Sequence, residues 1–87
     1  MRVSIDHGAA DFPFEQLAGI LRERIRAGTY PPGAKLPTII ALTGEFELSP
    51  MTVRRAMKVL SDEGLVRVVP GRGTYVASPL PADTWTA

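Results

Sequence analysis

The chain of 87 residues contains no cysteine and only one histidine, His7. Without cysteine neither a disulfide nor a thiolate-bound metal is possible, which is compatible with a reducing compartment. A catalytic site needs a nucleophile or a metal with a positioned base, and one histidine without paired acids on a shared face does not supply that arrangement. We therefore expect no catalytic residue, no metal and no cofactor.

Long apolar runs are also missing. Residues 1–10 lack the apolar run of a signal peptide, and no segment approaches the roughly 20 apolar residues that span a bilayer. We therefore expect a soluble, cytoplasmic protein with no membrane association.

Excess charge of either sign is small, because the formal net charge is only +1. Its distribution is uneven. Residues 49–76 hold five cations against two acids, a balance of +3, whereas the rest of the chain holds five cations against seven acids, a balance of −2. A local excess of cations is typical of a surface that binds nucleic acid, although an ordinary solvated helix face explains it equally well.

The chain does have enough apolar residues for one small domain. Hydrophobic residues make up 45% and charged residues 22%, which is typical of a globular chain. We expect a flexible lead-in over residues 1–11, a single domain over 12–77 and a linker or tail over 78–87. His7 in the lead-in and Trp85 in the tail carry no assignable role.

The most informative segment is a helix predicted over residues 50–63, with Ser49 as its N-cap and Pro50 at its first position. Four apolar residues from Val53 to Leu60 follow the i, i+3, i+4, i+7 rule and are expected to pack inward. The residues expected on the outward face and its flank are Met51, Arg54, Arg55 and Lys58. A short helix that presents arginine to the outside suits reading of the major groove of DNA.

Two further helices and a hairpin are predicted around it. Asp11 is expected to cap a helix over residues 12–27, and Thr38 a second helix that runs to Phe46. Lys35 and Leu36 are expected to form a short strand. The β-branched residues at 65–69 and the strand at 74–77 flank a turn at 70–73. The order is mainly α with a small β-hairpin, which is that of a winged helix-turn-helix with three helices and a two-stranded wing, a fold that also serves in protein docking.

Several spaced motifs in this order resemble the N-terminal DNA-binding domain of the GntR family of bacterial transcription regulators. The resemblance covers most of the chain, from about Phe14 to Ala77. Its main segments are Gln16–Ala18, Gly28–Pro37, Thr52–Ala56, Glu63–Val66 and Gly71–Val76.

The resemblance implies that a homodimer sets its two helices 50–63 into successive major grooves of a near-palindromic operator, with the wing residues 70–74 at the minor groove. It further implies that Arg54 reads a base edge, while helical geometry alone favours Arg55, which we keep as a base or backbone contact. The remaining residues expected to contact DNA are Thr38, Ser49, Met51, Thr52, Lys58, Gly71, Arg72 and Gly73. Hydroxyls and the free amides at helix N-termini can hydrogen-bond to phosphate oxygens, and a guanidinium can donate two hydrogen bonds to guanine.

The chain departs from the family pattern in the first turns of both helices of the helix-turn-helix. An acidic-arginine-acidic run is replaced by Ile39, Ile40 and Ala41, so the family's DNA-binding arginine is missing at Ile40. Pro50 replaces an arginine, and Glu47 replaces the turn glycine, where a left-handed backbone would cost about 1 to 2 kcal/mol. We expect one of the two isoleucines to be core and the other a tolerated exposed side chain, with a protein contact as the alternative.

We therefore expect a sequence-specific regulator of transcription that binds double-stranded DNA and acts as a repressor. A small-molecule effector is not expected to bind this segment. The competing hypothesis is a winged helix that docks a protein instead of DNA, and Arg72 has a competing interpretation as a hairpin-tip residue that favours solubility.

Overall fold

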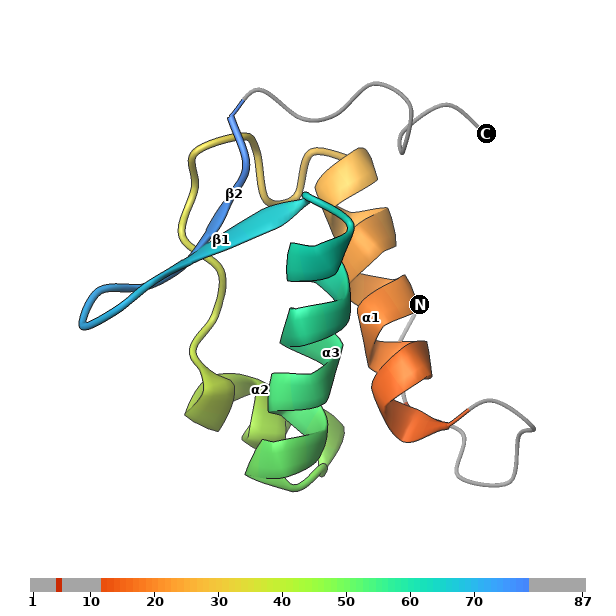
Figure 1. The fold of residues 1–87 in the computed structure, drawn as a ribbon. Coiled ribbons are helices and arrows are strands. Elements are labelled where there is room, and N and C mark those ends of the chain that lie inside the picture. The colour runs from red at the N-terminus through yellow and green to blue at the C-terminus, as the bar shows by residue number, and fades with distance from the viewer. Residues whose placement is uncertain (1–4, 6–11, 79–87) are drawn as a thin grey trace.

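A computed structural model of the chain describes residue 5 and residues 12–78. Three helices precede a two-stranded antiparallel sheet: α1 spans Pro13–Arg26, α2 Ile39–Phe46, α3 Pro50–Asp62, β1 Val66–Val69 and β2 Gly73–Val76. The helices pack together, and the hairpin projects from them as a wing (Figure 1). The predicted winged helix-turn-helix is confirmed. No helix in the described part of the chain has the length and apolar character needed to cross a membrane.

α2 and α3 begin directly after the capping residues that the sequence predicts, whereas the N-cap position of α1 is not the predicted residue. Thr38 Oγ1 accepts the N–H of Ala41 at 3.0 Å, and Ser49 Oγ accepts the N–H of Thr52 at 3.2 Å, as predicted. The predicted cap at Asp11 lies outside the described residues, and the N-cap position of α1 is Phe12, whose side chain makes no capping hydrogen bond. α1 starts there because the fixed φ of the proline that follows suits the first helical position.

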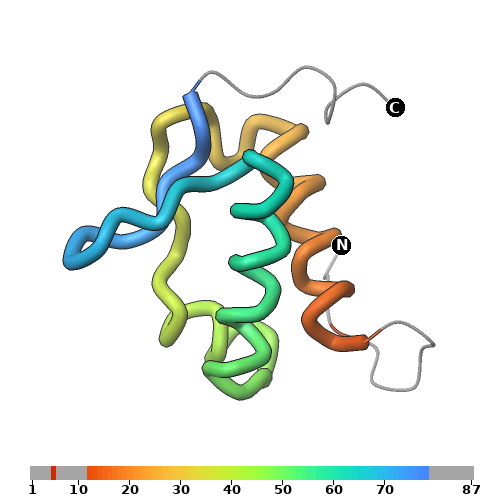
Figure 2. The backbone as a smooth tube through the Cα atoms, viewed as in Figure 1, coloured from red at the N-terminus to blue at the C-terminus, as the bar shows by residue number. Residues whose placement is uncertain are grey.

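The turn between α2 and α3 depends on Glu47, which adopts φ 55° and ψ 48°. This left-handed residue ends α2, and its N–H reaches the carbonyl of Thr43. Where the family has glycine, Glu47 therefore takes the left-handed conformation that costs a non-glycine residue about 1 to 2 kcal/mol. The turn sets α3 across α2, as the smooth path of the chain shows (Figure 2).

The core lies between the three helices and the base of the wing. The predicted inward stripe of α3 is entirely buried, and so are Leu17, Ala18, Leu21 and Ile25 of α1. Ile39 is partly buried against this core, whereas Ile40 is 83% exposed, which confirms that one isoleucine is core and the other is exposed. Within the predicted lead-in only Ile5 is described, and it packs half-buried against the core.

The wing is held by a third stretch of extended chain. Val66 pairs with Val76 and Val69 with Gly73, so the loop is residues 70–72 and the predicted turn is shorter by one residue. The predicted strand at Lys35 and Leu36 is a single bridge to Tyr75, extended by the hydrogen bond of Leu36 N–H to Thr74 O at 2.8 Å. The segment before α2 therefore fixes the wing relative to the helices.

Two arginines of α1 hold the helices together. Arg22 donates two hydrogen bonds to the Glu63 carboxylate, at 2.9 and 2.6 Å, which raises the pKa of Arg22 above its ordinary value. Arg24 donates to Glu45 at 2.8 Å and to Tyr30 at 2.9 Å, and its pKa is raised for the same reason. These cations are engaged within the fold.

Candidate nucleic-acid interface

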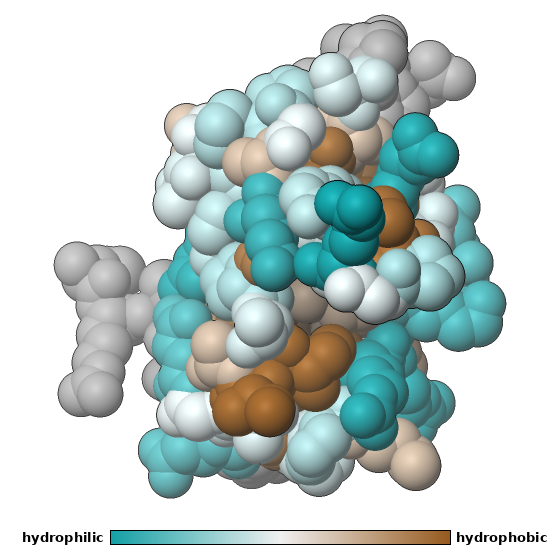
Figure 3. Space-filling model, turned by 90° about the vertical axis from the view of Figure 1, so that its left-hand side faces the viewer, coloured by the Kyte–Doolittle hydropathy of each residue, from teal (hydrophilic) through white to brown (hydrophobic). Residues whose placement is uncertain are grey.

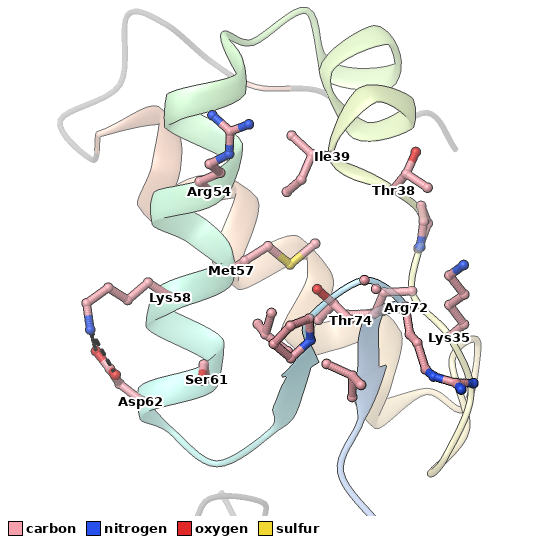
Figure 4. Close-up of a pocket in the computed structure, with 17 residues that line it drawn as sticks. Lys35, Thr38, Ile39, Arg54, Met57, Lys58, Ser61, Asp62, Arg72 and Thr74 are labelled. Carbon is pink, nitrogen blue, oxygen red and sulfur yellow. Dashed lines mark hydrogen bonds and ion pairs between the residues drawn. The ribbon is translucent and has the colours of Figure 1, made fainter.

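A hollow of about 670 Å³ separates α3 from the wing and from the start of α2. Four cations and one acid line it, and the cations come from three separate segments of the chain: Lys35, Arg54, Lys58 and Arg72. Met57 points into the hollow from α3, while Arg54 and Ile39 lie at one end of it (Figure 4). The concave surface therefore has an apolar floor and a cationic margin.

The cations of this margin differ in how far they are neutralised. Lys58 lies 3.2 Å from the carboxylate of Asp62, but both side chains are well exposed, and such a pair contributes less than about 1 kcal/mol. Within the described residues Lys35, Arg54 and Arg72 have no carboxylate partner. These three cations are available to an anionic ligand, unlike Arg22 and Arg24 of α1.

Arg54 and Arg55 are separated by the fold. Arg54 lines the hollow, whereas the guanidinium of Arg55 lies 4.3 Å from the centre of the Phe14 ring of α1. This cation–π contact holds Arg55 on the flank that faces α1. Helical geometry ranks Arg55 as the most outward arginine. Its side chain instead lies against the Phe14 ring of α1, a contact that the position of Arg55 on α3 alone does not predict.

The first turn of α3 carries a network of hydroxyl groups. Ser49 Oγ and Thr52 Oγ1 lie 2.9 Å apart, and Ser49 also caps the helix. A hydroxyl has one donor and two acceptor positions, so the pair retains the capacity to bind one further polar group. Met51 in the same turn is 70% exposed. These residues do not line the hollow. They lie at the N-terminal end of α3, shortly after the turn at Glu47.

The tip of the wing combines an exposed cation in the loop with two glycines in positive-φ conformations, one in the loop and one at the start of β2. Gly71 has φ +76° and open space around it, and Arg72 beside it is exposed. Gly73 has φ +126°, and a Cβ there would lie 2.8 Å from Cε of Lys35. Gly73 therefore lets the Lys35 side chain cross the wing closely.

Of the predicted residues, the structure brings Thr38, Arg54, Lys58, Gly71, Arg72 and Gly73 together around the hollow. Met51, Thr52 and Arg55 lie on the first part of α3 outside the lining, and Ser49 is the N-cap directly before that helix. Lys35 was missed by sequence reasoning, because the count of cations began at residue 49. Its signal was a cation in the segment expected to form a short strand, which the structure places beside the wing.

The surface in Figure 3 shows this side of the molecule, with the wing directed at the viewer. Hydrophilic side chains gather over the wing, and an apolar patch lies below them at the height of α2. The described residues contain no cluster of three metal-ligating side chains. The arrangement presents cations and a rigid helix end, which suits a large anionic surface.

Comparison with known proteins agrees with this geometry. Residues 13–76 match the family described as bacterial regulatory proteins, gntR family. The histidine utilization repressor of Klebsiella aerogenes is 38% identical over 72 residues, which cover 82% of this chain and 30% of that protein. The chain spans less than a third of the length of the first curated relatives.

Two solved structures are similar to most of the chain. YtrA from Sulfolobus acidocaldarius, a GntR-family transcription factor, has a TM-score of 0.81 at 31% identity, covering 97% of this chain and 88% of that one. The AraR DNA-binding domain in complex with operator ORX1 has a TM-score of 0.79 at 30% identity, covering 86% of this chain and 95% of that one. The chain therefore belongs to the gntR family of bacterial regulatory proteins, with the winged helix-turn-helix DNA-binding fold of that family.

Proposed function

We propose that this domain recognises a near-palindromic operator as the DNA-binding part of a transcription repressor, with α3 in the major groove and the wing loop at the adjacent minor groove. The observation that carries the proposal is the convergence of Lys35, Arg54 and Arg72 on one concave face, without carboxylate partners in the described part of the chain. The AraR domain of the same fold was solved with its operator.

The roles within the site follow from chemistry. Arg54 can donate two parallel hydrogen bonds to O6 and N7 of guanine, which makes it the base reader. We assign Arg55 to the phosphate backbone, because its contact with Phe14 holds it on the far flank of α3. Thr38 and the Ser49–Thr52 pair lie at helix N-termini, where hydroxyls and free amides bind phosphate oxygens.

A near-palindromic operator requires two copies of the domain, so we propose a homodimer on DNA. With chromosomal DNA as its partner, we propose that the protein acts in the bacterial cytoplasm. We propose that a small-molecule effector binds outside this segment, because we assign the hollow between α3 and the wing to DNA. The chain spans less than a third of the first curated repressors that it matches.

Mobility shifts with a pool of genomic fragments test the proposal. The chain should retain a subset of fragments in the presence of excess nonspecific DNA, and log Kd should rise linearly with log salt as counterions are released. Binding that ignores both sequence and salt would instead support the protein-docking hypothesis. The mass of the retained complex gives the number of copies per operator.

A further inference from the structure

Ile40 is the most exposed large apolar side chain among the described residues, at 83%. It lies in the first turn of α2, next to Ile39, which lines the hollow together with Arg54. An apolar patch at the height of α2 is visible below the wing, bordered by hydrophilic side chains (Figure 3). A large aliphatic side chain therefore stands exposed next to the proposed DNA-reading surface.

The first turn of α2 carries no charged side chain. Residues 39–41 are Ile, Ile and Ala, so no side chain among them can donate to a phosphate or hydrogen-bond a base edge. The cations that line the neighbouring hollow, in contrast, can donate hydrogen bonds to phosphates and base edges. Lys35 and Arg72 can bind phosphates and would draw this turn towards the duplex, so we expect the patch to meet DNA through van der Waals contact alone.

The major groove offers one apolar feature, the C5-methyl group of thymine. We propose that Ile40 contacts the methyl group of a thymine in the operator half-site, close to the base that Arg54 reads, and thereby selects thymine at that position. The inference rests on the proposed function. Ile39 packs half-buried against the core and lines the hollow, which anchors the first turn of α2 beside the proposed DNA-reading surface.

The decisive substrate is uracil, which keeps every hydrogen-bonding group of thymine and lacks only the methyl. The preferred operator is first selected from a random library with the 87-residue chain. Each thymine of a half-site is then replaced in turn by uracil, and Kd is measured by fluorescence anisotropy for the wild type, Ile40→Ala and Phe12→Ala. Phe12 is the matched control, an exposed apolar residue at the N-cap position of α1, on a different element from Ile40.

At one thymine position, uracil should weaken wild-type binding about fourfold, as expected for loss of one buried methyl. Phe12→Ala should keep that sensitivity, and Ile40→Ala should lose it while melting at the wild-type temperature. The inference is overturned if the wild type prefers an operator but has no uracil-sensitive position, or if the sensitivity persists in Ile40→Ala. Either result leaves the proposed function standing. A wild type without any sequence preference overturns both.

Discussion

Arg54 and Arg55 are adjacent and identical in side chain, and the fold gives them different surroundings. Arg54 lies on the margin of the hollow, and Arg55 stacks over Phe14. A guanidinium engaged with an aromatic ring loses part of its freedom to reach a base edge. The difference makes the pair a matched test of base reading, because each substitution removes one positive charge from the same helix.

Arg54→Ala should lose about 1 to 3 kcal/mol of binding free energy on the preferred operator and relax discrimination at one base pair. Arg55→Ala should weaken all sequences alike and leave the base preference intact. Competition with operators changed at single base pairs measures both. An unchanged preference in Arg54→Ala would contradict the role assigned to it.

At the scale of elements, the wing is a hairpin fixed along one edge. The Lys35 side chain crosses Gly73, and Leu36 hydrogen-bonds to Thr74, so the loop at residues 70–72 projects from a stable base. Arg72 in that loop is exposed and has no carboxylate partner among the described residues. The position suits a phosphate contact that is independent of sequence.

Arg72→Ala should weaken binding to every duplex and reduce the slope of log Kd against log salt by about 1. Arg67→Ala is the control, since Arg67 is an exposed cation of the same hairpin outside the lining of the hollow. The slope is measured by titrations at several salt concentrations. Equal slopes for the two variants would support the competing interpretation, in which Arg72 favours solubility and does not contact DNA.

The N-terminus of α3 depends on Ser49, whose hydroxyl accepts the N–H of Thr52. Ser49→Ala should lower the free energy of unfolding by about 1 kcal/mol, because that amide loses its partner. Ser61→Ala, an exposed position in the last turn of the same helix, should change it little. Urea unfolding followed by circular dichroism compares the free energies of unfolding of the two variants. Equal decreases would contradict a stabilising role of the cap.

At the scale of the whole molecule, one small core supports every element of the site. A domain of this size buries only about 60 to 65% of the surface of its unfolded chain, so its stability margin is thin. Arg22 and Arg24 tie α1 to the end of α3 and to α2, and Leu60 of α3 is completely buried between the elements. Loss of core packing should therefore affect the entire DNA-binding face at once.

Leu60→Ala should lower the free energy of unfolding by about 2 to 5 kcal/mol, through lost apolar burial and the cavity left behind. Val68→Ala removes apolar atoms from a side chain that is 59% exposed and should cost far less. Thermal unfolding measures both. If the two variants have the same melting temperature, the burial of Leu60 does not stabilise the fold as expected.

The sequence by itself determined the features that depend on neighbours along the chain. The caps at Thr38 and Ser49 and the buried stripe of α3 follow from local hydrogen bonding and helical period. These interactions act within a few residues, so the order of elements and the family resemblance could be predicted.

Only the tertiary structure decided which side chains share a surface. Phe14 meets Arg55, Lys35 crosses Gly73, and Ile39 joins Arg54 at one hollow, although the members of each pair are distant in sequence. Such contacts arise because packing of the common core fixes the angles between α1, α3 and the wing. Those angles separate two adjacent arginines into different surroundings, a distinction that no local pattern contains.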